Sequence, residues 1–168
     1  MNSESMIAIL LVEETRRRLF DESFPRAKQC LETLSESEIW ASPNANTNSV
    51  GNLILHLCGN ARQWIISGLG GVLDTRTRQV EFDSKGTHSR AELIQMVEDL
   101  ERDLGPVLAQ ITPEKLIARH PVQGYEESGV SILVHVVEHF SYHVGQITHI
   151  VKALKNVDTG YYAGEDLG

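Results

Sequence analysis

The stretch that decides the fold is SILVHVVEHFSYHVGQITHIVKAL, residues 131–154. Its apolar side chains recur every three or four positions, which is the period of one face of an α-helix. The members of this apolar face are Ile132, Leu133, Val136, Val137, Phe140, Val144, Ile147, Ile150, Val151 and Leu154. The pattern predicts a long amphipathic helix near the end of the chain, whose apolar side needs partner helices.

Three more segments carry the same period, and they run from about 5 to 33, from about 48 to 67 and from 89 to about 110. Ile7 and Leu10 belong to the apolar face of the first, and Pro25 should kink or restart it. No strand alternation is convincing, although 120–129 is either a loop or a short hairpin. The segments predict an all-α four-helix bundle that forms one domain over residues 1–168, with a polar connection at 74–86 and a loosely ordered tail after about residue 156.

Composition narrows the classes of function. The formal net charge of −8 argues against a nucleic-acid partner, because such binding depends on clustered cationic side chains. No apolar stretch is long enough to span a bilayer, and the N-terminus lacks the basic region of a secretory signal. We therefore expect no membrane partner and a cytoplasmic location, in which Cys30 and Cys58 are reduced, buried thiols.

Three of the seven histidines lie four residues apart on the last predicted helix: His135, His139 and His143. Helical neighbours at this spacing differ by roughly 40° around the axis and roughly 6 Å along it, so two imidazoles can meet at one ion. The outer two are roughly 80° and 12 Å apart. A single ion can therefore take only one adjacent pair, and the spacing does not say which.

A third ligand has to come from another helix, because zinc and similar ions usually take at least three protein ligands. His56 lies in the apolar run 53–58 of the second predicted helix, where a buried imidazole needs a polar partner. Facing helices of a bundle can assemble a metal site in this way. Histidines on apolar faces are also often satisfied core residues, and spacing alone leaves both interpretations open.

Two motifs resemble those of the DinB-like metal-binding bundles. HFSYHVGQ, residues 139–146, is similar to the last-helix signature of that family, in which two histidines four residues apart precede x-Gly-Gln. SVGNLILH, residues 49–56, is similar to its second-helix signature, in which a Ser-Val/Ile-Gly-x-Leu start precedes the first ligand. The order and spacing of the motifs match. GNARQW at 59–64 and DTRTRQVEF at 74–82 resemble an uncharacterised subgroup.

The resemblance implies an up-down-down-up topology and a divalent metal, often nickel or zinc, held by His56, His139 and His143. His135 then becomes a neighbour of the ligands on the same side of the helix. The better understood relatives are thiol transferases that use bacillithiol or mycothiol. The resemblance thus also suggests a low-molecular-weight thiol as a cosubstrate, and a homodimer.

Four residues are candidates for bonding a ligand imidazole, a bound water or a substrate: His135, Asn60, Gln63 and Gln146. Asn60 and Gln63 follow His56 by four and seven positions and share its face, and Gln146 follows the last of the three clustered histidines by three. Polar bonding between helices is the alternative role for these side chains.

The arginines after the second helix also have two interpretations. Arg62, Arg76 and Arg78 can bind the carboxylate of an acidic thiol cofactor, since guanidinium groups bind carboxylates bidentately. They can instead form ion pairs with the nearby acidic residues Asp74, Glu81 and Asp83. We favour the ion pairs.

Two hypotheses of function follow. The first is a metal-dependent low-molecular-weight thiol S-transferase, or a related hydrolase, that acts on a small-molecule substrate, because a metal can generate the nucleophilic thiolate. The alternative is a non-catalytic, stress-related metal-binding protein whose histidines are structural. An open coordination position that solvent reaches favours the first, and a closed coordination sphere favours the second.

Overall fold

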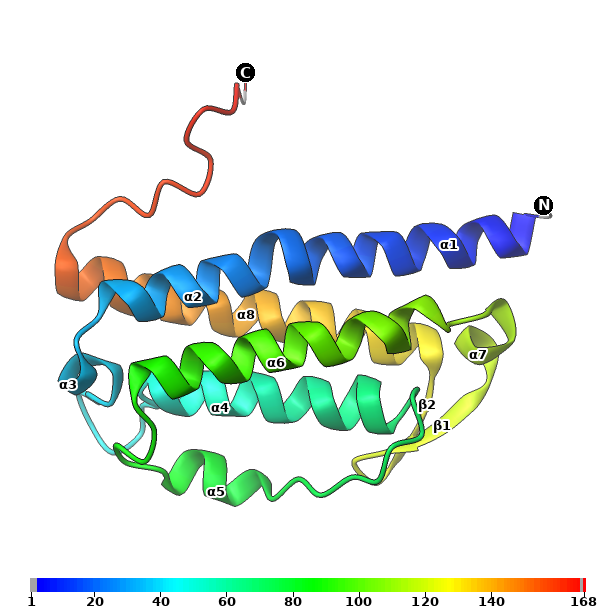
Figure 1. Cartoon of the computed structure of the whole chain (residues 1–168), viewed down its shortest axis with the longest axis horizontal. Helices are drawn as coiled ribbons and strands as arrows, with labels where there is room; N and C mark the ends of the chain where they lie inside the picture. Colours follow the sequence, from blue (N-terminus) through cyan, green and yellow to red (C-terminus); the bar gives the residue numbers. More distant parts are fainter. Residues whose placement is uncertain (1–2, 167) are drawn as a thin grey trace.

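The computed structural model describes residues 3–166 and residue 168. Four long helical segments lie side by side in the described part of the chain (Figure 1). Two of them contain a π-helical stretch, labelled η. The segments are α1 (Ser3–Arg16) continued by η1 (Arg17–Ser23) and α2 (Phe24–Thr33), α4 (Val50–Ala61) continued by η2 (Arg62–Ser67), α6 (Arg90–Ala109) and α8 (Gly129–Lys155).

The directions of these segments follow the up-down-down-up order. In Figure 1, α1–α2 and α8 run from right to left, whereas α4 and α6 run from left to right. α2 and α4 each pack against both α6 and α8, so the helices surround one core. The predicted all-α four-helix bundle is confirmed.

The remaining elements are short. They are α3 (Glu36–Ile39), α5 (Arg78–Asp83), α7 (Pro113–Ile117), β1 (Arg119–Val122) and β2 (Tyr125–Ser128). β1 and β2 form an antiparallel hairpin, so the hairpin interpretation of 120–129 is the right one. Its two turn residues, Gln123 and Gly124, have φ of 52° and 83°, as a type I′ turn requires.

Local chemistry explains where the long helices begin. Ser49 caps α4 by accepting a bond from the backbone N–H of Asn52, whose side chain accepts in return from the backbone N–H of Ser49. A capping box of Ser89 and Glu92 starts α6 in the same way. Pro25 occupies the first turn of α2, directly after η1, so the helix restarts there as expected.

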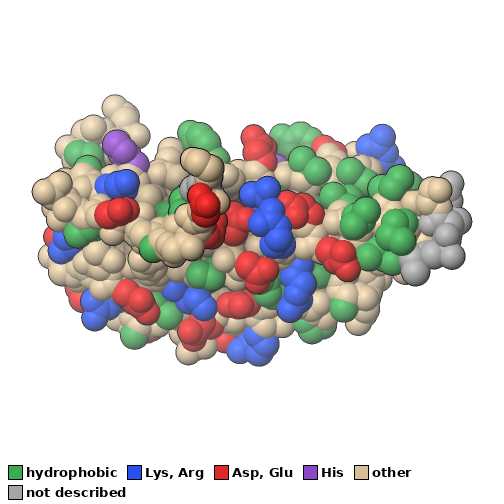
Figure 2. Space-filling view, turned by 90° about the horizontal axis from the view of Figure 1, so that it is seen from above, with side chains coloured by type: hydrophobic (Ala, Val, Ile, Leu, Met, Phe, Trp, Pro, Cys, Tyr) green, Lys and Arg blue, Asp and Glu red, His purple; other side chains and the backbone are tan. Residues whose placement is uncertain are grey.

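The core lies between the four segments, where Phe24 and Phe140 pack edge to face with ring centroids 5.3 Å apart. Ile7 and Leu10 do not join it, contrary to the sequence-based expectation, because they are 66% and 55% exposed. The first turns of α1 extend past the neighbouring helices (Figure 1). Figure 2 shows hydrophobic side chains gathered at this end of the molecule.

The connection between η2 and α6 contains a helix that the sequence did not indicate. We call residues 72–84 the strap, and α5 within it packs on α4. Thr77, the residue before α5, makes no capping bond with its side chain. The Asn52 amide of α4 instead donates to the carbonyl oxygens of Glu81 and Ser84, each at 2.8 Å. The Asn52 side chain thus anchors the C-terminal end of α5 to α4.

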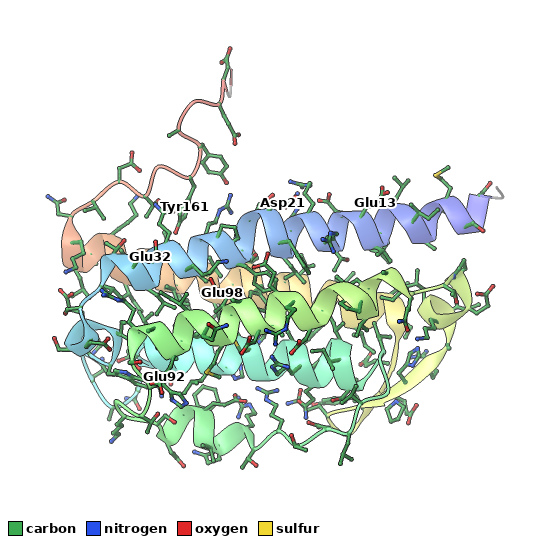
Figure 3. The ribbon with its side chains drawn as sticks, viewed as in Figure 1. Glu13, Asp21, Glu32, Glu92, Glu98 and Tyr161 are labelled. Atoms are coloured by element: carbon green, nitrogen blue, oxygen red, sulfur yellow. The ribbon has the colours of Figure 1, made fainter. Side chains whose placement is uncertain are left out.

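The tail after α8 contacts the bundle through Tyr161, which Figure 3 labels beside α2. The Tyr161 hydroxyl lies 3.2 Å from Cys30 Sγ and 2.8 Å from Thr148 Oγ1. Cys30 and Cys58 are free and buried, as expected. A loosely ordered tail stays a prediction.

The described surface carries both signs of charge. In Figure 2 acidic and basic side chains are interspersed, and the described atoms of that face form no basic stripe. Among the residues that the structure describes, no helix is both long and apolar enough for a membrane span.

Candidate metal centre

Two helices bring three histidines together. His56 comes from α4 and is buried, whereas His139 and His143 come from consecutive turns of α8 and are half-buried. Each residue offers one ring nitrogen, and these three atoms lie within 4.8 Å of one another. The Nε2 atoms of His56 and His139 are 3.0 Å apart.

This separation is close to that of two ligands on one ion. Two imidazole nitrogens at about 2.05 Å from a tetrahedral zinc would be roughly 3.3 Å apart, and a smaller angle at the ion brings them closer. The rings of His56 and His143 are perpendicular, at 88°, with centroids 5.2 Å apart. The pair of His56 and His139 is thus already at the spacing of two ligands on one ion, and the wider separations within the cluster would have to shorten.

His135 lies outside the cluster. Its ring stacks on Trp64 with centroids 3.7 Å apart and 21° between the planes. Its Nε2 accepts a hydrogen bond from the Asn60 amide at 3.2 Å. The structure therefore groups His56 with the second and third histidines of α8, and the first has other partners.

Glu81, expected only to form an ion pair, also bonds the cluster through its carboxylate. Glu81 Oε2 lies 2.9 Å from His56 Nδ1, on the side of the ring away from the other histidines. Arg76 donates to the same carboxylate from Nε at 2.7 Å and from Nη2 at 2.8 Å. The favoured ion-pair interpretation is thus right for Arg76. Both Arg76 and Glu81 belong to the segment 74–82 that resembles the subgroup, but no local sequence pattern indicates that Glu81 contacts His56.

The hydrogen bonds around Glu81 favour one tautomer of His56. Arg76 Nη2 lies 3.1 Å from His56 Nδ1, and Arg76 can only donate. The Glu81 carboxylate can only accept, and its pKa lies below the ordinary value: burial opposes this shift, but bonds from Arg76 and His56 outweigh it. A proton on His56 Nδ1 bonds the carboxylate at 2.9 Å and leaves the Nε2 lone pair facing His139, whereas an unprotonated Nδ1 would instead accept from Arg76 at 3.1 Å. The shorter contact favours the proton on Nδ1.

The other candidate neighbours have different roles. Gln146 Oε1 accepts from His143 Nδ1 at 2.7 Å, so the Nε2 of His143 is also free of its proton. Gln63 reaches the cluster only through Arg76, whose Nη1 donates to Gln63 Oε1 at 2.8 Å. Asn60 Oδ1 and His139 Nδ1 are two buried atoms for which the described residues supply no partner.

Comparisons with known proteins agree with this fold. A family described as "Protein of unknown function (DUF1572)" matches residues 9–161. The chain belongs to this family. The DUF1572 chain resembles the crystal structure of a DinB-like protein from Bacillus cereus ATCC 10987, at 15% identity over 80% of this chain and 87% of that one, with a TM-score of 0.64. It also resembles that of the Bacillus subtilis DinB-like protein YjoA, at 17% identity over 89% and 94%, with a TM-score of 0.65.

These two likenesses confirm the DinB-like fold. At sequence identities of 15% and 17%, the likenesses show the fold of this DUF1572 chain and do not show its function. No curated protein matches the chain. Its chemistry has to be argued from the site.

The donor set of the DUF1572 chain suits a divalent ion. Burial, together with the neighbouring His143, His56 and His135 and the Arg76 charge, lowers the pKa of His139 to about 3. Burial also lowers the pKa of His143. Neutral imidazoles are the form that binds metal, so these rings are ready ligands near pH 7. His56, His139 and His143 are the residues that could hold the ion.

The main grooves of the DUF1572 bundle lie elsewhere. One of about 810 Å³ runs between the α1–η1 segment and α8, and one of about 540 Å³ lies between the strap and α4. The three clustered histidines line neither groove. Solvent reaches the site at the half-buried side chains of His139 and His143.

Proposed function

We propose that this protein binds a divalent metal ion, nickel or zinc, through the Nε2 atoms of His56, His139 and His143. The observation that carries the proposal is the convergence of three ring nitrogens within 4.8 Å, from two helices. Hydrogen bonds at Nδ1 of His56 and of His143 support it, because they leave Nε2 of each ring as the electron-pair donor.

We propose further that the centre activates a low-molecular-weight thiol for transfer to an electrophilic small molecule. A divalent ion bound there lowers the pKa of a coordinating thiol or water into the physiological range. Three protein ligands leave a coordination position open. The half-buried rings of His139 and His143 mark the side on which a small molecule would enter.

A second candidate is a structural metal centre without turnover. It is favoured by the position of the two main grooves, which the clustered histidines do not line. An ion shared by α4 and α8 would join two helices of the bundle. The mass-action stabilisation by a bound metal would serve this role without any reaction.

Metal analysis tests the proposal, with His135 as the internal control. We expect purified protein to bind about one zinc or nickel ion per chain, and His56→Ala, His139→Ala and His143→Ala each to lose it. His135→Ala should keep the ion, because that ring stacks on Trp64. Retention by the first three variants would refute the site. Thiol transfer to an electrophile, measured with and without the metal, then separates the catalytic from the structural candidate.

We also propose a homodimer that uses the α1–α8 side of the bundle. Ile7 and Leu10 of α1 and Val134 of α8 are 66%, 55% and 55% exposed in the single chain. Exposed apolar side chains that gather on one surface often mark a protein interface.

A further inference from the structure

The strap holds an ion pair against α4 directly over a glycine. The side chains of Arg76 and Glu81 are 5% and 11% exposed, and two hydrogen bonds join them. Gly59 of α4 lies beneath the pair. A Cβ atom added to Gly59 would overlap Glu81 Oε1 and would approach Arg76 Nε to 3.0 Å. The absence of a side chain at Gly59 therefore permits the approach of the carboxylate to α4.

Two separate attachments aim this carboxylate. The backbone carbonyl of Glu81 accepts from the amide of Asn52, which is itself fixed in the capping box that starts α4. The side chain is held by Arg76 from the preceding part of the strap. With both ends fixed, Oε2 points at His56 Nδ1, 2.9 Å away.

A stabilising role does not account for the pair. Removing two charges from water costs several kcal/mol per ion, and replacing a buried ion pair by apolar side chains is often neutral or stabilising. The Glu81 carboxylate nevertheless has a third partner, the imidazole that faces the other two histidines. A carboxylate behind a ligating imidazole fixes the tautomer and orientation of the ring and raises its basicity.

We propose that Glu81, clamped by Arg76 over Gly59, is the positioning residue of the metal centre. It keeps the proton of His56 on Nδ1 and aims the Nε2 lone pair at the ion. The inference rests on the proposed metal site and adds to it three residues that touch no ion: Gly59, Arg76 and Glu81. The pair also keeps the position behind His56 electrically balanced, because the guanidinium offsets the carboxylate.

The first test is a matched pair of glycine substitutions. Gly59→Ala displaces the carboxylate, whereas Gly145→Ala on α8 adds a Cβ that meets nothing within 4 Å. Both changes lie in a helix, where alanine is preferred by about 1 kcal/mol. Zinc affinity, measured by competition with a chromophoric chelator, should fall 10- to 100-fold in Gly59→Ala and stay unchanged in Gly145→Ala. Wild-type zinc affinity in a folded Gly59→Ala protein would overturn the proposal.

The second test removes the pair without leaving an unpaired ion. The double variant Arg76→Leu with Glu81→Leu should fold, by circular dichroism, and should lose zinc affinity 10- to 100-fold. A merely structural pair would leave the zinc affinity of the folded double variant unchanged, and that result refutes the inference. This variant decides the question if Gly59→Ala does not fold.

A third measurement separates failure of this inference from failure of the metal site. Nitrogen-15 NMR of the histidine rings in metal-free protein should show His56 with its proton on Nδ1 in the wild type and a mixture of tautomers in the double variant. If the wild type binds no zinc or nickel, the proposed function fails, and the tautomer still tests Glu81. If His56 is the Nε2–H tautomer in the wild type, the positioning role is wrong even where metal binds.

Discussion

Replacing each of two buried asparagines of α4 by leucine should have very different effects on the stability of the metal-free protein. Asn52 and Asn60 are 7% and 3% exposed and lie on the same helix. Asn52 is fully bonded: its amide nitrogen donates to Glu81 O and Ser84 O at 2.8 Å each, and its oxygen accepts from Ser49 N and Oγ at 3.2 and 2.6 Å. Asn60 has one bond, to His135, and a buried oxygen without a partner among the described residues.

The magnitudes follow from these bonds. A hydrogen bond contributes about 1 kcal/mol net, and a buried group left without a partner costs about 1–3 kcal/mol. Asn52→Leu loses all of its bonds and leaves the carbonyls of α5 unpaired, so the free energy of unfolding should fall by about 4 kcal/mol or more. Asn60→Leu loses one bond, whose partner His135 is only half-buried and can bond water instead, and it removes a buried unpaired acceptor. The free energy of unfolding should therefore stay unchanged or rise by up to about 2 kcal/mol.

Urea unfolding followed by circular dichroism, in the presence of a chelator, measures both variants. A loss of more than about 1 kcal/mol in Asn60→Leu would show that the Asn60 oxygen is satisfied in solution, and the reasoning would fail.

Further predictions concern pH, packing, metal and assembly. The free energy of unfolding of the metal-free protein, measured in urea, should decrease as the pH falls from 6.5 toward 5. In this range His139 is protonated in the unfolded chain but stays neutral in the folded chain, where its pKa is about 3. His139→Ala should reduce this dependence on pH. Phe140→Ala should cost about 3–5 kcal/mol in urea unfolding, whereas Tyr142→Ala on the same helix, 63% exposed, should change stability by less than about 0.5 kcal/mol. Zinc at 100 times its dissociation constant should stabilise the wild type by about 2.7 kcal/mol and leave His56→Ala unchanged, as thermal shifts would show. Leu10→Lys should shift light-scattering mass from dimer to monomer, and a wild-type monomer would refute the proposed homodimer.

The sequence predicts the long helices well, because their signals are local. The apolar period of 131–154 acts within a few residues, and the structure forms a helix where it indicates. The capping boxes that start α4 and α6 are equally local. Ile7 and Leu10 share the same local period but are exposed. Periodicity identifies one face of a helix, and it does not tell whether another helix reaches far enough to cover that face.

The candidate site was less accessible to prediction, because its parts meet only in the fold. Helical spacing limited an ion to one adjacent pair of histidines, and the resemblance, not the spacing, chose His139 and His143. Glu81 could not be placed against His56 by any local rule. Its helix, α5, has no capping bond of its own at Thr77 and depends on Asn52, which lies 20 residues or more earlier in the chain.

The buried polar groups around the three histidines lower the stability of the metal-free fold. Arg76 and Glu81 are removed from water, and Asn60 and His139 each keep a buried polar atom without a partner among the described residues. Apolar side chains at these positions would avoid that cost. The Nδ1 bonds of His56 and His143 leave their Nε2 lone pairs for an ion. Metal binding to the folded state alone then offsets part of the cost, so adding a chelator should lower the free energy of unfolding measured in urea.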